Sequence, residues 1–189
     1  MEKLVNIDKY RPRIVDESLK RYLKTFGAVC VEGPKWCGKT WTSSIHCNSE
    51  IMIGDPANNF QNRSLAEVSP KLILDGKTPR LIDEWQEVPP LWDAVRYAID
   101  QNSQKGQFVL TGSATPKRKG VLHSGAGRIG KLRMRPMSLY ESGSSSGSIS
   151  LRELCNGSMK PAATGEVDIK NLREVIRCKP LSLSRLCKS

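Results

Sequence analysis

Residues 33–40 read Gly33-Pro34-Lys35-Trp36-Cys37-Gly38-Lys39-Thr40 and match the pattern G-x-x-x-x-G-K-[ST]. Glycines let backbone N–H groups wrap closely around a phosphate, and a helix that begins after the loop adds a positive dipole. Lys39 occupies the position that reaches the β- and γ-phosphates of a nucleotide, and Thr40 the position whose hydroxyl ligates Mg²⁺. The sequence therefore predicts a nucleotide-binding loop, with residues 33–40 and Trp41 as its candidate contacts.

The sequence on both sides of the loop fits this interpretation. Ala28–Val31 is a short apolar run typical of a buried strand, and the chain after Thr40 continues as a helix to about Cys47. The alternative is a glycine-punctuated turn between a strand and a helix, with no ligand. The strand before and the helix after the loop favour the phosphate-binding interpretation.

A second motif, Arg80-Leu81-Ile82-Asp83-Glu84, is an apolar strand that ends in two carboxylates. Asp83 is the candidate that, together with Thr40, holds the metal. Glu84 is the candidate catalytic residue that orients or deprotonates an attacking water. The alternative is a solvated cluster of carboxylates at a strand end, since Glu87 is also close in sequence.

A third strand, Phe108–Leu110, turns polar at its end, where Thr111 and Ser113 follow. A hydroxyl there would lie between the first two motifs and bond the γ-phosphate or the attacking water. Thr111 and Ser113 both qualify, and Ser113 joins Glu84 among the candidate catalytic residues. The alternative is an ordinary strand exit with a Thr-Gly-Ser turn.

The remaining pattern alternates strands with helices. Helices are predicted over residues 15–26 and from Pro89-Pro90 to about Asn102, and one or two short helices within residues 57–78. Further strands are predicted at Ile51–Ile53 and Ile129–Met134. This order predicts an α/β fold, a three-layer architecture in which helices flank a parallel five-stranded sheet.

The chain of 189 residues carries 30 Lys and Arg against 19 Asp and Glu, a net charge of +11. Such an excess makes nucleic acid, an anionic membrane or a phosphate ligand the first partners to consider. Much of it follows residue 110, in Lys117-Arg118-Lys119 and in Lys131, Arg133 and Arg135, which alternate along one predicted strand face. The alternative is a solvated basic face.

Several classes of protein are disfavoured. No apolar run approaches the ~18–20 residues of a membrane span, and the N-terminus lacks the apolar core of a secretory signal. The six cysteines form no Cys-x-x-Cys pair, so no zinc site is predicted. Scattered cysteines without a signal peptide predict reduced thiols and a cytoplasmic protein with no membrane partner.

Together these motifs resemble the AAA+-type P-loop ATPases, in the bacterial and archaeal group whose full-length members add a C-terminal domain of unknown function. The resemblance covers about residues 8–160. Besides residues 33–40, the matching stretches are Phe26–Val29, Leu81–Gln86, Leu110–Ser113, and Gly127-Arg128-Ile129 followed by Arg135–Glu141.

The resemblance implies ATP and Mg²⁺ as ligands, and a sheet in which the strand ending at Thr111 separates the strands of the first two motifs. It makes Arg128 the candidate arginine that stabilises transition-state charge, in a neighbouring subunit if the chain forms a homo-oligomer. The alternative is a surface residue, with Arg118, Arg133 and Arg135 competing for the role. Tyr10–Arg13 are candidates for contact with adenine.

The expected organisation is a P-loop core over residues 1–141, a Ser/Gly linker over 142–148 and a partial C-terminal segment over 149–189. The tail from Arg177 lacks periodicity and does not resemble the family's continuation, which suggests a truncated or frameshifted end and impaired turnover. Mg²⁺-dependent ATP binding and hydrolysis is the predicted function. A small nucleotide kinase and a basic nucleic-acid-binding module with a nucleotide switch are the alternatives. Trp36, Trp85 and Trp92 are expected to be packing residues.

Overall fold

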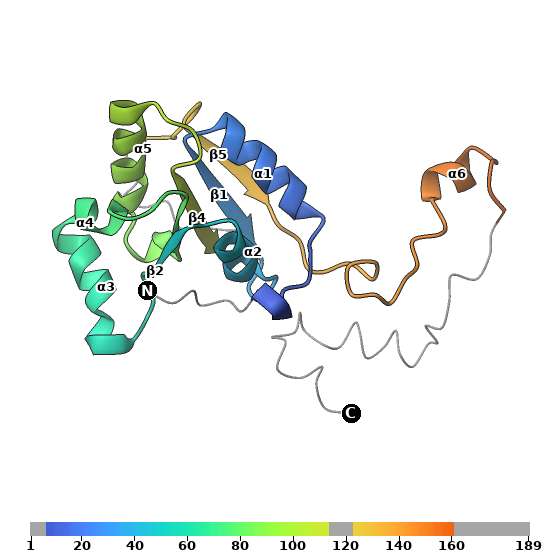
Figure 1. Ribbon diagram of the computed structural model, residues 1–189, viewed down its shortest axis with the longest axis horizontal. Helices are drawn as coiled ribbons and strands as arrows, with labels where there is room; N and C mark the ends of the chain where they lie inside the picture. The colour runs from blue at the N-terminus through green and yellow to red at the C-terminus, as the bar shows by residue number, and fades with distance from the viewer. Residues whose placement is uncertain (1–6, 114–122, 161–189) are drawn as a thin grey trace.

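The computed structural model describes residues 7–113 and 123–160 (Figure 1). Five parallel strands form one sheet in the order β2-β3-β4-β1-β5. They are β1 (Ala28–Gly33), β2 (Ser49–Met52), β3 (Arg80–Asp83), β4 (Phe108–Ser113) and β5 (Ile129–Arg133). The predicted five-stranded parallel sheet is confirmed, and β4 lies between β1 and β3 as expected.

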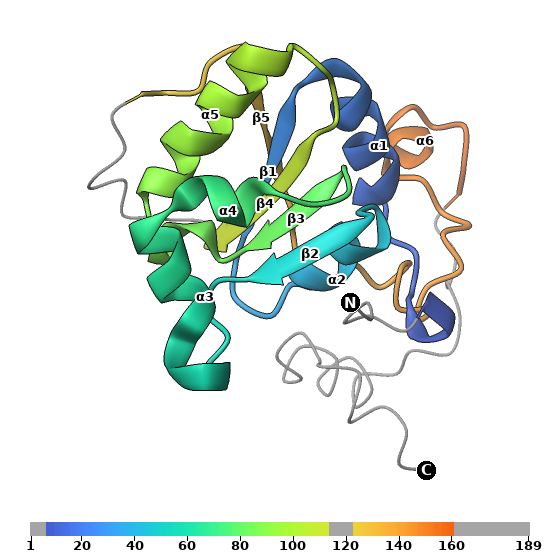
Figure 2. The same cartoon turned by 60° about the vertical axis from the view of Figure 1, so that its left-hand side comes forward.

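Helices cover both faces of this sheet and make the predicted three layers (Figures 1 and 2). One face carries α3 (Ala57–Val68), α4 (Pro70–Leu74) and α5 (Pro90–Asn102), and the other carries α1 (Val15–Thr25) and α2 (Lys39–Ile45). The ambiguous stretch 57–78 thus forms two helices, and a proline begins the second, where its missing N–H costs nothing.

Side chains on the strands alternate between two apolar cores, because successive residues of a strand point to opposite faces. Ile82 and Leu110 pack beneath α3, α4 and α5, whereas Leu81 and Val109 pack with Leu19 of α1 on the other face. All five side chains are fully buried. A sheet covered on both faces explains why the strands read as continuous apolar runs.

The parallel arrangement brings the three motif-bearing strand ends to one edge of the sheet. Gly33 at the end of β1 pairs in register with Ser113 at the end of β4, and Ile82, just before Asp83, pairs with Leu110. The opposite edge holds the starts of the strands, where Ala28 pairs with Ile129. The described residues also contain two 3-10 turns, Ile7–Lys9 and Trp85–Glu87.

After β5 the chain leaves the layers, and Figure 1 shows the short α6 (Leu151–Cys155) away from the sheet. The predicted linker 142–148 lies in this segment, and the domain boundaries stay predictions. Residues 161–189, with the tail from Arg177, lie outside the described residues. Within 7–113 and 123–160, no helix has the length and apolar character needed to cross a membrane.

Candidate functional site

The loop between β1 and α2 has the backbone geometry that close wrapping requires. Gly38 adopts a left-handed conformation with φ of 94°, immediately before α2 begins at Lys39. A Cβ on Gly33 would lie 2.5 Å from the carbonyl oxygen of Met134 and 2.9 Å from the sulfur of Cys37. Both positions therefore require glycine, the first for its φ angle and the second for the close approach of another backbone.

The ammonium of Lys39 lies inside this loop. The residue is buried, and its Nζ donates to the carbonyl oxygens of Gly33 (3.1 Å) and Pro34 (3.0 Å). Hydrogen bonds are stronger when both partners are charged. The buried ammonium of Lys39 would therefore bind an anionic oxygen more strongly than it binds these two neutral carbonyls. Lys39 is thus placed to meet an anion held by the loop.

Asp83 joins the loop to the two neighbouring strands. Its Oδ1 accepts hydrogen bonds from the hydroxyls of Thr40 (2.7 Å) and Thr111 (2.5 Å). Burial raises the pKa of the Asp83 carboxyl above its ordinary value, although the hydrogen bonds from Thr111 and Thr40 and the charge of Lys39 oppose this shift. The two candidate metal ligands, Thr40 and Asp83, are therefore in direct contact.

Thr111, two residues before the end of β4, places its hydroxyl between the first two motifs. It is fully buried, donates to Asp83 and accepts from the backbone N–H of Glu84 (3.1 Å). For Ser113 the structure describes only the backbone, which ends β4 opposite Gly33. A catalytic role of Ser113 stays a prediction.

Glu84 has an unusual backbone for a residue with a side chain, with φ of 55° and ψ of 46°. Its carboxylate accepts a hydrogen bond from the side-chain amide of Gln86, and the oxygen of that amide is buried with no hydrogen-bond partner in the described part of the chain. Glu87 is exposed and pairs with Arg63 (3.4 Å). The three carboxylates thus have separate environments. Of the three, only Asp83 and Glu84 contact the edge of the sheet where the motif-bearing strands end, which we call the motif edge.

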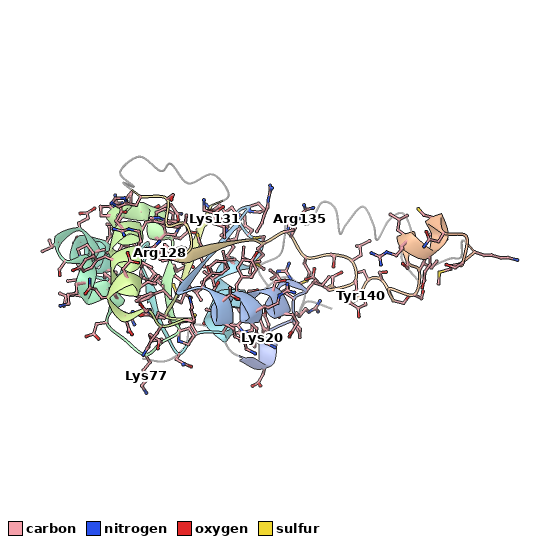
Figure 3. All side chains as sticks on the ribbon, turned by 90° about the horizontal axis from the view of Figure 1, so that it is seen from above. Lys20, Lys77, Arg128, Lys131, Arg135 and Tyr140 are labelled. Carbon is pink, nitrogen blue, oxygen red and sulfur yellow. The ribbon has the colours of Figure 1, made fainter. Side chains whose placement is uncertain are left out.

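Arg128 lies at the other edge of the sheet. Its carbonyl accepts a hydrogen bond from the N–H of Ala28, so Arg128 lies beside the first residue of β1. That position is about 17 Å from the end of β1 that bears the loop. Its exposed side chain donates to Asp100 (2.8 Å). Figure 3 shows Arg128 and Arg135 at opposite ends of β5. The structure does not bring Arg128 to the loop of its own chain, and a role in a neighbouring subunit stays a prediction.

The basic residues of β5 and its extension have the predicted alternation. Lys131, Arg133 and Arg135 are exposed, whereas Leu132 and Met134 are buried. β5 is an edge strand, where exposed cations also discourage pairing with other chains. Nucleic-acid binding by this stripe stays a prediction. Its other members, Lys117, Arg118 and Lys119, lie outside the described residues.

The tryptophans divide into two groups. Trp85 and Trp92 are buried with ring centroids 4.9 Å apart, so their prediction as packing residues is confirmed. The same prediction for Trp36 is wrong, because its side chain is 60% exposed. A left-handed backbone with φ of 70° accompanies this exposure, and the Lys35 ammonium lies 5.5 Å from the ring centroid. Trp41 is half-buried in the first turn of α2.

The sequence by itself indicates no individual role for Gln86 or Glu141, and it makes Tyr10–Arg13 candidates for contact with adenine. The structure turns the side chains of both terminal residues of that stretch into the protein: Tyr10 bonds Asp16, and Arg13 bonds the carbonyl of Cys37 and the carboxylate of Glu141. Gln86 lay within the stretch that carries the family resemblance. Nothing in the sequence links Arg13 to Glu141, because 128 residues separate them.

Asp16 connects α1 to α2 behind the loop. It accepts from the backbone N–H of Arg13 (2.7 Å), the hydroxyl of Tyr10 (2.7 Å) and Nε2 of His46 (3.0 Å). Burial alone would raise the pKa of the Asp16 carboxyl, but the hydrogen bonds from His46, Arg13 and Tyr10 outweigh it and hold the pKa below the ordinary 3.8. The ionised carboxylate therefore stabilises the folded state.

This shift predicts an acid-dependent stability. A carboxyl whose pKa is lowered on folding stabilises the protein above its unfolded-state pKa, and the stabilisation is lost as the pH falls through the folded-state value. Asp16→Asn should lower the free energy of unfolding by about 1–3 kcal/mol at pH 7. The difference in the free energy of unfolding between Asp16→Asn and the wild type should shrink below pH 3.8, the ordinary pKa of the carboxyl. Urea titrations across this range measure it, with the exposed Glu17→Gln as control. A difference that stays constant from pH 7 to about pH 2 would contradict the prediction.

Comparisons with known proteins agree with the fold and the motifs. The family model described as "AAA domain" matches residues 25–143, which include the loop, β3 and β4. Uncharacterized proteins of Mycobacterium bovis and Mycobacterium tuberculosis are each 31% identical over 130 residues, which is 67% of this chain and 29% of each relative. The chain thus spans less than a third of the length of these relatives.

A solved structure of a Thermotoga maritima RuvB variant matches 67% of this chain and 47% of its own, with a TM-score of 0.38 and 21% identity. The family model, by contrast, covers well over half of the chain and every strand end that bears a motif. The chain belongs to the AAA domain family of P-loop nucleoside triphosphatases.

Proposed function

We propose that this chain binds ATP together with Mg²⁺ and hydrolyses it to ADP and phosphate. The observation that supports this most is the chain of contacts from Thr40 through Asp83 and Thr111 to the backbone of Glu84, next to the buried Lys39. It joins the proposed phosphate-binding loop, the proposed metal ligands and the candidate base at one edge of the sheet.

In this proposal the loop binds the β- and γ-phosphates. Lys39 exchanges the carbonyls of Gly33 and Pro34 for phosphate oxygens, and its charge offsets the charge that develops during transfer. Because the ammonium already lies inside the loop, little reorientation of the side chain is needed.

The donor set at Thr40 and Asp83 fits Mg²⁺. Magnesium prefers oxygen ligands and in such sites uses one or two carboxylates, with substrate phosphates and water completing the shell. The described ranges contain no group of three or more His, Cys, Asp or Glu that could hold a metal by itself. The site therefore suits a metal that arrives with the nucleotide and polarises its phosphates.

Glu84 is the proposed base for the attacking water. Its backbone N–H donates to Thr111, which also bonds Asp83, and its carboxylate accepts from Gln86. These contacts support a fixed position for the Glu84 side chain. General-base catalysis of this kind contributes on the order of 10²–10⁴-fold to a rate. Arg128 would complete such a site only from a neighbouring subunit of a homo-oligomer.

Phosphate release from ATP by the purified chain tests the proposal. Release should require Mg²⁺ and fall to the background rate when EDTA removes the metal. Binding of a fluorescent ATP analogue is measured alongside, because the chain spans only 29% of its relatives. Tight binding and hydrolysis that ignore EDTA would contradict the metal site. Transfer of the phosphate to added nucleoside monophosphates, in place of water, would identify a kinase.

A further inference from the structure

The guanidinium of Arg13 is buried against the outer side of the phosphate loop. Nη1 donates to the carbonyl of Cys37 (2.8 Å), Nη2 to the carbonyl of Arg135 (2.9 Å) and Nε to Oε1 of Glu141 (3.0 Å). One side chain thereby connects the loop, the end of the β5 extension and the segment that follows it. The Arg13 and Glu141 side chains expose only 6% and 8% of their surface.

Glu141 closes the segment 136–141 onto the residues before α1. Its Oε1 also accepts from the N–H of Ile14 (2.8 Å), and its Oε2 accepts from the N–H (2.7 Å) and the hydroxyl (2.8 Å) of Ser138. Burial opposes ionisation, yet these bonds and Arg13 hold the pKa of the Glu141 carboxyl below its ordinary value. The Arg13–Glu141 pair is thus a charged anchor held by several hydrogen bonds.

The two loop glycines pack against this anchor and the residue that leads into it. A Cβ on Gly38 would lie 3.2 Å from Nη1 of Arg13 and 3.5 Å from the terminal methyl of Met134. A Cβ on Gly33 would lie 2.5 Å from the carbonyl oxygen of Met134. Arg13 and the end of β5 therefore form the wall that fixes the loop from outside.

The bond to Cys37 also orients a neighbouring donor. The peptide between Cys37 and Gly38 is planar and trans, so the Cys37 carbonyl and the Gly38 N–H point in opposite directions. Arg13 holds the carbonyl on the outer side of the loop. The Gly38 N–H then points to the opposite side, where backbone N–H groups of such loops cradle phosphate.

We propose that Arg13 is a positioning residue for the phosphate loop, and that the Arg13–Glu141 pair couples nucleotide binding to the segment 135–141. The inference rests on the proposed function, because it requires a nucleotide in this loop. A phosphate that binds the Gly38 N–H restricts the motion of the Cys37–Gly38 peptide. Because Arg13 bonds the Cys37 carbonyl, the Arg135 carbonyl and Glu141, this restriction extends to Arg135 and Glu141. Coupling of this kind is reciprocal. If nucleotide binding strengthens the binding of a partner to segment 135–141, that partner strengthens nucleotide binding by the same factor.

The positioning role is tested by the affinity for a fluorescent ATP analogue in the full chain. Arg13→Gln should weaken binding on the order of tenfold, because the Cys37 carbonyl loses a charged donor. Arg13→Lys keeps the charge but has one nitrogen for three acceptors, and should weaken binding about threefold. The control is Arg21→Gln, an exposed arginine of α1, which should bind like the wild type. Thermal melting shows that each variant is folded.

The coupling is tested by hydrogen–deuterium exchange of residues 135–142 with and without the analogue. Nucleotide should slow exchange there in the wild type and in Arg21→Gln. This response should be lost in Arg13→Gln and in Glu141→Gln, which removes the charge from Glu141 but keeps the Arg13–Cys37 bond. A merely structural role would change stability and leave the response to nucleotide intact.

Lys39→Ala distinguishes the two levels of failure. If it binds the analogue like the wild type, the nucleotide is not in this loop and the proposed function fails. If Lys39→Ala weakens binding while folded Arg13→Gln and Arg13→Lys do not, only the positioning role is overturned. If Arg13→Gln does not fold, Arg13→Lys decides the positioning role. An unchanged exchange response in Glu141→Gln overturns the coupling.

Discussion

Replacing Lys39 with alanine is expected to weaken ATP binding on the order of 100-fold. The Lys39 ammonium is buried in the loop, and in the bound state it would donate to the negatively charged oxygens of the β- and γ-phosphates. Hydrogen bonds between charged partners contribute about 1.5–3 kcal/mol, which corresponds to roughly 10–150-fold in affinity. Titration with a fluorescent ATP analogue, or isothermal calorimetry with ATP, measures the effect.

The matched control is Lys20→Ala, a lysine on the surface of α1 whose side chain is exposed and pairs with Glu17 (Figure 3). It removes the same atoms and charge without touching the loop, so its affinity for ATP should equal that of the wild type. Equal affinities of Lys39→Ala and the wild type would mean that residues 33–40 do not hold the phosphates.

Glu84→Gln is expected to keep ATP bound and to lower hydrolysis by on the order of 10²–10⁴-fold. The amide has the shape of the carboxylate and can still accept from Gln86, so the backbone at Glu84 and its bond to Thr111 should persist. The amide is not a base, however, and cannot take a proton from water. Single-turnover phosphate release together with equilibrium binding separates the two effects.

Glu87→Gln is the control for this substitution. Glu87 lies three residues further along, is exposed and pairs with Arg63, so its charge can be removed without altering the motif edge. Its hydrolysis rate should match that of the wild type. If Glu84→Gln hydrolyses ATP at the wild-type rate, Glu84 is not the base. If the variant instead no longer binds ATP, the Glu84 carboxylate contributes to ATP binding.

The elements of the fold could be predicted because they depend on local pattern. The apolar runs of β1, β3 and β4, and the Gly-Lys-Thr sequence after the first, determine strands and loop over a few residues. Their meeting follows from parallel pairing, which places all carboxyl ends at one edge. The choice between Thr111 and Ser113 depends on the register of β4 against β3, which local pattern does not define.

Other features depend on contacts distant in sequence or on backbone angles. The bond between Arg13 and Glu141 spans 128 residues, and the exposure of Trp36 accompanies a φ angle that tryptophan rarely adopts. The place of Arg128 could have been predicted, however. A residue that precedes a parallel strand lies at the amino edge of the sheet, opposite the loop, so only a neighbouring subunit could use it.

A crystal structure of the chain with Mg²⁺ and a non-hydrolysable ATP analogue tests the nucleotide site most directly. We predict that the Lys39 Nζ leaves the carbonyls of Gly33 and Pro34 for phosphate oxygens. Thr40 and Asp83 should lie at the metal, and the Glu84 carboxylate should face the γ-phosphate. A nucleotide bound elsewhere, with Lys39 still on the two carbonyls, would contradict the assignment of residues 33–40 as the phosphate-binding loop.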